Sequence, residues 1–183
     1  MKRDREELVD ELLVLHAQAG NAEAMRALVE RWQRPLWRHA YRLTDDAEAA
    51  WDVLQEAWVA IIRGLARLED AAQFPTWAFR IVTHKAADAI AAKTRQRRVR
   101  QEASEAIPQV RRSGTDQSDV TRQVMNRLGM RDRQVLTLYY LEGFSVADVA
   151  RILRVPEGTV KSRLYKARGR SKELYEFYGK RDK

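Results

Sequence analysis

Basic and hydroxyl side chains crowd the stretch PEGTVKSRLYKARGR at residues 156–170. Lysine and arginine can pair with phosphate oxygens, and both can donate hydrogen bonds to guanine edges. Within the same stretch Val160, Leu164 and Ala167 recur at the spacing of one helix face. The pattern therefore predicts a helix with a narrow apolar face that packs inward and a wide basic face that is offered to an anionic partner.

This basic helix is the second half of a longer pattern, residues 145–164, that has the spacing of a helix-turn-helix. Ala150 is small where the two helices would cross most closely, and a helix of this kind fits the major groove of DNA. A helical hairpin with a solvated basic face is the alternative. The candidate DNA-contacting residues are Thr159, Lys161, Ser162, Arg163, Tyr165, Lys166 and Arg168.

The composition restricts the class of protein. The formal net charge is +8, and because residues 1–95 hold nearly equal numbers of acids and bases, the excess lies in residues 96–183. An anionic partner is therefore expected for the second half. The start of the chain lacks the apolar run of a signal peptide, and no segment approaches the roughly 18 apolar residues of a membrane span, so we expect a cytoplasmic protein.

Catalytic chemistry has little support in the sequence. The chain has no cysteine, which excludes disulfides, thiolate metal sites and cysteine nucleophiles. His16, His39 and His84 are too far apart to form a ligand motif, and no phosphate-binding or dinucleotide-binding glycine pattern occurs. We therefore expect no enzyme activity, no cofactor and no metal site.

Hydrophobic periodicity predicts an all-α protein without convincing strands. Asp45 is predicted to cap the third helix with Glu48 as its capping-box partner, and Pro35 is predicted to kink or split the second. A loop is expected at residues 66–74. The predicted helices are 4–18, 22–43, 46–64, from Pro75 to about residue 98, 119–129, 131–142, 145–153 and 157–177.

Periodicity fails between residues 96 and 119, where Pro, Gly, Ser and scattered charges predict a flexible basic linker. The chain is thus expected to form two small helical modules joined by this tether. The predicted segments are an N-terminal helix at 1–18, a first module at 19–98, a linker at 99–118 and a second module at 119–183.

Two stretches resemble bacterial sigma factors, and the resemblance covers residues 20–98 and 120–175. VLTLYYLEGFSVADVARILRVPEGTVKSRLYKAR looks like sigma region 4, the helix-turn-helix that reads the −35 promoter element. AWDVLQEAW and FPTWAFRIVTHKAADAI, in the first half, resemble sigma region 2. The order and short length are similar to the extracytoplasmic-function (ECF, group 4) subfamily of the sigma-70 family.

This resemblance implies a promoter-specificity subunit whose partners are core RNA polymerase, through its β′ coiled coil and β subunit, and promoter DNA. An anti-sigma factor is a further candidate partner. The resemblance places polymerase docking on Asp52, Gln55 and Glu56. It also implies that the 66–74 loop and the helix after it capture a flipped −10 base, although Trp77 also suits a core position. The implied −10 residues are Phe74, Trp77, Arg80, His84, Lys85, Arg95, Arg97 and Arg98.

Some positions depart from the family pattern. Many relatives have Asn where this chain has His84, and Arg154 occupies a turn position that often holds Gly. A positive φ at Arg154 would cost about 1–2 kcal/mol. Two alternatives stay open: a stand-alone helix-turn-helix regulator, which leaves AWDVLQEAW unexplained, and a helical adaptor that binds polymerase or an anti-sigma factor without directing transcription.

Overall fold

The structure, a computed structural model, describes residues 2–103 and 117–179, and this part of the chain is helical with no strand. The prediction of an all-α fold is therefore confirmed. The described residues divide into two compact units, one that extends to Ala87 and includes Arg151–Arg154, and one that holds the rest. No described helix is long and apolar enough to cross a membrane.

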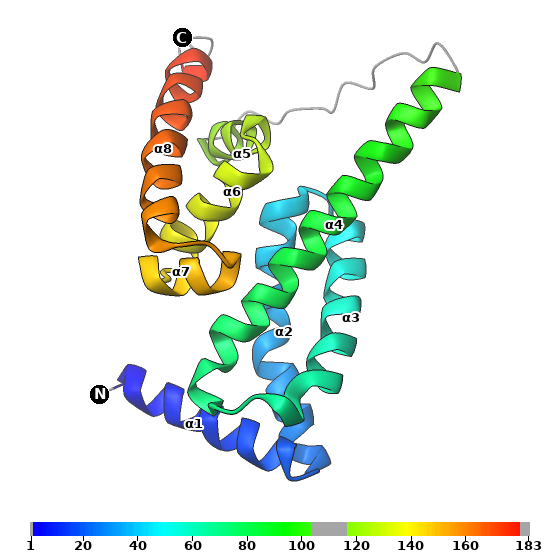
Figure 1. The fold of residues 1–183 in the computed structure, drawn as a ribbon, viewed down its shortest axis with the longest axis vertical. Helices are drawn as coiled ribbons and strands as arrows, with labels where there is room; N and C mark the ends of the chain where they lie inside the picture. Colours follow the sequence, from blue (N-terminus) through cyan, green and yellow to red (C-terminus); the bar gives the residue numbers. More distant parts are fainter. Residues whose placement is uncertain (1, 104–116, 180–183) are drawn as a thin grey trace. The chain divides into compact units, whose positions relative to one another are not determined.

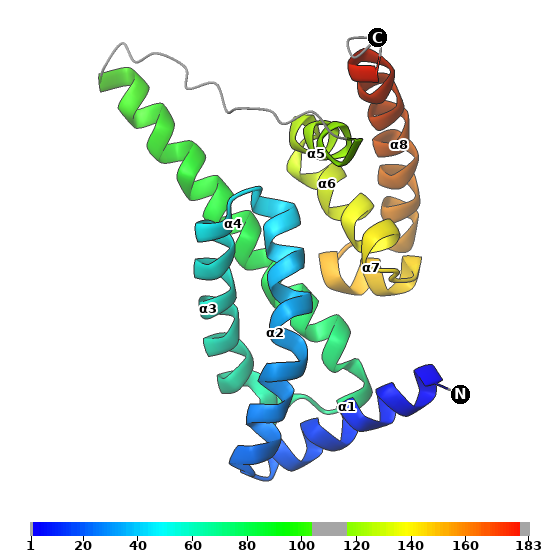
Figure 2. The ribbon, with the colours of Figure 1, turned by 180° about the vertical axis from the view of Figure 1, so that it is seen from behind.

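The first unit is built around three helices that lie side by side, while a fourth crosses one end (Figure 1, Figure 2). Leu28, Leu36, Leu54, Ile61 and Val82 are among the buried residues of its core. Two short 3₁₀ turns connect α3 to α4. The elements are α1 (Lys2–Gln18), α2 (Ala22–Thr44), α3 (Ala47–Gly64), η1 (Leu65–Arg67), η2 (Ala71–Gln73) and α4 (Phe74–Ala103).

The junction between α2 and α3 corrects one prediction. Asp46, not Asp45, caps α3: its side chain accepts a hydrogen bond from Ala49 N at 3.2 Å. Asp45 instead ends α2 in the left-handed conformation, at φ 52°, and its N–H donates to Tyr41 O. Aspartate tolerates this conformation better than most residues, which explains why two consecutive aspartates suit this turn.

Pro35 does not split α2, which continues through it as one helix. Its neighbour Leu36 is fully buried. The buried packing on α2 thus maintains the helix where proline removes one backbone hydrogen bond.

Helix α1 packs through an unexpected face. Leu8, Leu12 and Leu15, which recur at the spacing of one helix face, remain 57%, 55% and 53% exposed. Asp10 and Val14 are buried instead. The face of α1 that meets the first unit therefore mixes polar and apolar side chains, and periodicity alone would have chosen the other face.

The second unit is centred on contacts that α8 makes with α5 and α6. Val135, Leu138 and Val160 are fully buried in it. Arg170 of α8 forms an ion pair with the buried Asp132 of α6. The remaining elements of the chain are α5 (Gln117–Arg127), α6 (Met130–Leu136), a π-helical turn η3 (Thr137–Leu141), α7 (Val146–Leu153) and α8 (Glu157–Gly179).

The predicted linker, residues 99–118, is helical at both ends. Helix α4 continues to Ala103, and α5 begins at Gln117. The absence of an apolar stripe therefore did not mark the end of a helix, because an exposed helix needs no buried face. The middle of the predicted linker, residues 104–116, lies outside the described residues.

Candidate nucleic-acid interface

The start of α7 is fixed by a reciprocal cap. Asp148 N donates to Ser145 Oγ at 3.1 Å, and Ser145 N donates to Asp148 Oδ2 at 3.2 Å. This is a capping box, with aspartate in the place of the more common glutamate. The sequence S-V-A-D carried this signal before an apolar run, and the sequence analysis missed it.

The turn between α7 and α8 is formed by Arg154, which has the left-handed φ of 53°. Val155 N donates to Ala150 O at 3.1 Å, which closes the end of α7 in the manner of a Schellman motif. Arg154 therefore adopts the positive φ that is costly for a residue with a Cβ. This tight turn leads directly into the basic helix.

Helix α8 separates its apolar and basic residues as predicted. Val160, Leu164 and Ala167 are buried. Tyr165 is 76% exposed, Thr159 and Arg163 are half-buried, and the other predicted contacts are exposed. All seven therefore have surface available for an external partner. Local bonds orient two of them: Ser162 Oγ donates to Thr159 O at 3.0 Å, and Arg168 Nε donates to Leu164 O at 3.3 Å.

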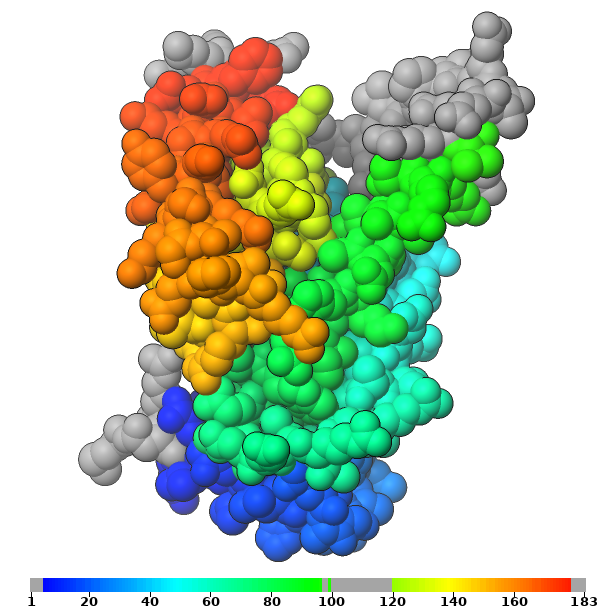
Figure 3. Space-filling view, viewed as in Figure 1, coloured from blue at the N-terminus to red at the C-terminus, as the bar shows by residue number. Residues whose placement is uncertain are grey.

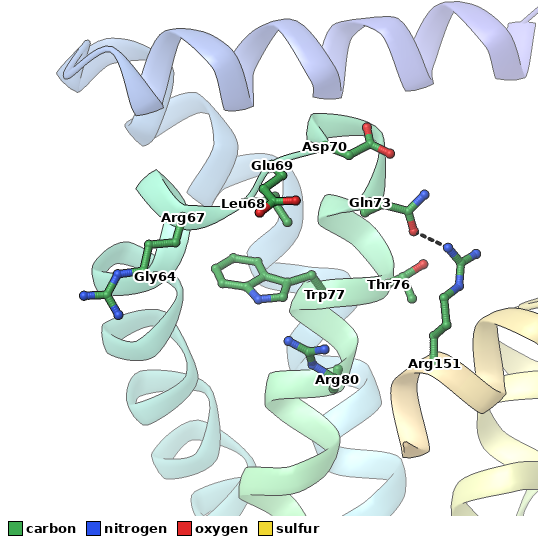
Figure 4. Close-up of a pocket in the computed structure, with 10 residues that line it drawn as sticks. All are labelled: Gly64, Arg67, Leu68, Glu69, Asp70, Gln73, Thr76, Trp77, Arg80 and Arg151. Carbon is green, nitrogen blue, oxygen red and sulfur yellow. Dashed lines mark hydrogen bonds between the residues drawn. The ribbon is translucent and has the colours of Figure 1, made fainter. Parts of the chain in front are cut away.

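A surface depression in the first unit lies between the connecting turns and the start of α4 (Figure 4). The turns and this helix start are exposed on the face shown in Figure 3. The depression combines an indole ring, two cations, two carboxylates, an amide and a hydroxyl. Its lining in the first unit includes Gly64, Arg67, Leu68, Glu69, Asp70, Gln73, Thr76, Trp77 and Arg80.

These groups suit an unstacked nucleobase. An indole face can stack on a base, and amide or hydroxyl groups can bond its Watson–Crick edge. Arg80 supplies positive charge near the same surface. Burial, the largest cause, lowers the pKa of Arg80 below its ordinary value, yet a guanidinium remains protonated at neutral pH.

Trp77 lies against the backbone of α3 at Gly64. A Cβ at residue 64 would come within 2.9 Å of the indole Cζ2 of Trp77, so the absence of a side chain allows this close approach. Trp77 is half-buried, and its ring also lies 6.2 Å from that of Phe74. The indole is thus part of the packing and part of the depression's lining.

The position of Phe74 argues against its predicted role as a DNA contact. Its side chain is fully buried, and its ring forms a T-shaped contact with that of Trp32, with centroids 5.7 Å apart. The first residue of α4 is therefore a core residue that anchors the end of the connecting turns. The sequence placed it directly after the connecting turns but did not show whether its side chain faced the solvent or the core.

The remaining predicted −10 residues differ in their surroundings. Lys85 Nζ bonds Glu56 Oε2 at 2.9 Å, so this lysine is paired with a carboxylate of α3. His84 and Arg95 are exposed. The side chains of Arg97 and Arg98 lie outside the described part of the structure.

The three predicted polymerase-docking residues, Asp52, Gln55 and Glu56, lie exposed on α3. Trp51 beside them is 46% exposed, and its ring lies 5.6 Å from that of Trp37. Trp51 was not among the residues predicted from the sequence. Its place in AWDVLQEAW, directly before Asp52, was a signal that could have identified it, because exposed tryptophan is frequent in binding surfaces.

Comparisons with known proteins match both halves of the chain. Residues 28–96 match the family model described as Sigma-70 region 2, and residues 119–170 match that described as Sigma-70, region 4. RNA polymerase sigma-H factor of Pseudomonas aeruginosa is 31% identical, over 87% of this chain and 90% of that protein. ECF RNA polymerase sigma factor SigM of Mycobacterium tuberculosis is 32% identical, over 90% and 83%. ECF RNA polymerase sigma-E factor of Escherichia coli is 27% identical, over 89% and 92%.

Solved structures have a similar fold. CnrH, determined in complex with the cytosolic domain of CnrY, gives a TM-score of 0.69 at 24% identity, with coverage of 92% of this chain and 97% of CnrH. Sigma factor RpoE from Bartonella quintana, determined with the anti-sigma factor NepR, gives 0.67 at 22% identity, with coverage of 85% and 98%.

Proposed function

The chain belongs to the ECF group of the sigma-70 family of RNA polymerase sigma factors, and we propose that it binds core RNA polymerase and directs initiation at specific promoters. The observation that carries this proposal is the open basic face of α8, presented after a capped α7 and a tight turn. A region 2 match in the same chain adds the second half of a promoter-reading subunit.

In this proposal α8 enters the major groove at the −35 element. Lys161, Lys166 and Arg168 are exposed cations that can pair with phosphates, and Arg163 can donate to a base edge. Tyr165, whose side chain is 76% exposed, supplies an aromatic edge and a hydroxyl. Arg170 is assigned no DNA contact, because it is paired with Asp132 inside the unit.

The depression beside the connecting turns is proposed to capture a base of the opened −10 element. Trp77 offers a stacking surface, while Gln73 and Thr76 offer polar groups for a base edge. Arg80, His84, Lys85 and Arg95 belong to α4, which continues from the same site. Lys85 is proposed to contribute less to DNA binding, because its ion pair with Glu56 must break before it can contact DNA.

Docking on core polymerase is proposed for the exposed face of α3. Asp52 and Glu56 supply carboxylates for arginine-rich partners such as the β′ coiled coil, and charge-assisted pairs fix register. Trp51 adds an aromatic anchor of the kind that dominates interface energies. Binding to the β subunit, and restraint by an anti-sigma factor of the kind that holds RpoE, complete the proposed partners.

The chain acts in this proposal as a cytoplasmic, non-catalytic subunit, with the chemistry left to the polymerase. The test is run-off transcription with purified sigma-free core polymerase and sheared genomic DNA from the source organism, with the chain added or withheld. New discrete 5′ ends that depend on the chain support the proposal, and their upstream DNA gives both promoter elements. Core binding without new ends would favour the adaptor, and duplex binding without polymerase the stand-alone regulator.

A further inference from the structure

Helix α1 ends directly over the turns that form the proposed base-capture site. Gln18, the last residue of α1, donates from Nε2 to Leu65 O at 2.9 Å and to Leu68 O at 2.7 Å. Because both partners are carbonyl oxygens, only the amide nitrogen of Gln18 can bond them. The Gln18 side chain thereby joins Leu65, the first residue of η1, to Leu68, the residue directly after η1.

The turns themselves have few internal bonds. Leu68 N donates to Leu65 O at 3.0 Å, and Gln73 N donates to Asp70 O at 3.0 Å. Asp70 also accepts from Ala72 N through its side chain. Each of these bonds lies within one turn, so none of them spans the connection between η1 and η2 at residues 68–70. The contact from α1 at Leu68 therefore helps to hold this connection.

A second attachment holds α1 in register. The buried Asp10 accepts a hydrogen bond from Trp32 Nε1 at 3.1 Å and forms an ion pair with Arg31. Trp32 in turn meets the buried ring of Phe74, the residue that follows η2. Helix α1 is thus linked to the start of the connecting turns through Gln18 and to their end through Asp10 and Trp32.

We propose that Gln18 is a positioning residue that holds the 65–73 turns in the conformation that accepts a −10 base. Leu68, Glu69 and Asp70 line the depression from these turns, which lie between α1 and Trp77 in Figure 4. A shift of Leu68 would change the depth of the site. This inference rests on the proposed function and gives the N-terminal helix a role that its sequence did not indicate.

The test compares variants that differ in one donor. Gln18→Glu keeps the size but removes the N–H groups, and Gln18→Lys restores a donor. Ala19→Glu adds the same negative charge as Gln18→Glu at the neighbouring exposed position. Each variant is assayed for initiation at a promoter found with the unmodified chain and at versions with one −10 base replaced.

We expect Gln18→Glu to reduce, by about tenfold, the ratio of initiation at the original promoter to initiation at the versions with a replaced −10 base. This is the size expected from two lost hydrogen bonds. Gln18→Lys and Ala19→Glu are expected to keep most of this discrimination. Core affinity and −35 binding should stay unchanged, and amide exchange should accelerate within residues 65–73 of the free Gln18→Glu chain.

Undiminished discrimination by Gln18→Glu would overturn the positioning role. An equal loss in Ala19→Glu, or a loss accompanied by weaker core binding and a lower unfolding midpoint, would also overturn it, since charge or general stability would then explain the effect. Failure of the unmodified chain to initiate would instead overturn the proposed function itself.

Discussion

His39 Nε2 and Thr83 Oγ1 lie 2.8 Å apart in the interior of the first unit, where they join α2 to α4. Thr83 Oγ1 also donates to Phe79 O at 2.7 Å. A hydroxyl has one hydrogen, so the threonine oxygen must accept from the histidine, and His39 therefore carries its proton on Nε2. Both side chains are fully buried.

Replacement of Thr83 by valine should destabilise the first unit by about 1–3 kcal/mol, because His39 loses its buried acceptor. Thr83→Ser keeps the hydroxyl and should cost less. Tryptophan fluorescence during urea unfolding is a selective measurement, since all five tryptophans lie in α2, α3 and the first turns of α4. Equal midpoints for the valine and serine variants would show that the hydrogen bond contributes little.

The proposed −35 interface predicts that substitutions of two neighbouring cations, Arg163 and Lys161, have different effects. Arg163→Ala should cost about 1–3 kcal/mol and relax preference at one base pair, because it removes a base-edge donor. Lys161→Ala should weaken binding to all sequences alike and reduce the salt slope by about 1, because it removes a phosphate contact. Titration of holoenzyme with −35 duplexes at several salt concentrations measures both quantities.

Lys172→Ala is the matched control for these variants. Lys172 is a cation of the same helix, one turn after Arg168, and its Nζ lies 3.9 Å from Glu176 Oε1. Its removal should leave −35 preference unchanged. An Arg163→Ala chain with intact base preference would place the reading of that element on other residues.

The helix periods and the apolar face of α8 could be read from the sequence because each depends on local spacing. The face of α1 could not, because it packs partly through hydrogen bonds to groups that are distant in sequence: Gln18 donates to the carbonyl of Leu65, and Asp10 accepts from the indole of Trp32. Phe74 was misassigned for a related reason. Its position beside the turns was clear, but only the packed structure shows that Trp32 covers it.

Charge reversal at Asp52 should weaken the proposed docking on core polymerase. Asp52→Lys reverses the charge of an exposed carboxylate on α3, and we expect core affinity to fall by about tenfold or more, as for a charged pair at an interface. Glu56→Lys also breaks the bond to Lys85 and places two cations side by side. Its effect on affinity therefore includes a local change on α4.

Fluorescence-monitored titration with core polymerase distinguishes these contributions. Glu30→Lys, an equal charge reversal on an exposed position of α2, is the control and should bind as the unmodified chain does. Trp51→Ala should weaken binding without a change in net charge. Unchanged affinity in Asp52→Lys and Trp51→Ala together would move the docking surface away from this face.

Arg154→Gly should stabilise the helix-turn-helix. The left-handed φ of 53° costs a residue with a Cβ about 1–2 kcal/mol, and glycine avoids this cost while losing about 0.4–1 kcal/mol through its freer unfolded chain. The expected net gain therefore lies between zero and about 1.6 kcal/mol. Arg154→Ala removes the same cation but keeps the Cβ, so it should show no such gain. The difference can be measured by amide exchange of the peptides that cover α7 and α8, with peptides from α2 as the reference. Equal protection in the glycine and alanine variants would show that the turn is not strained.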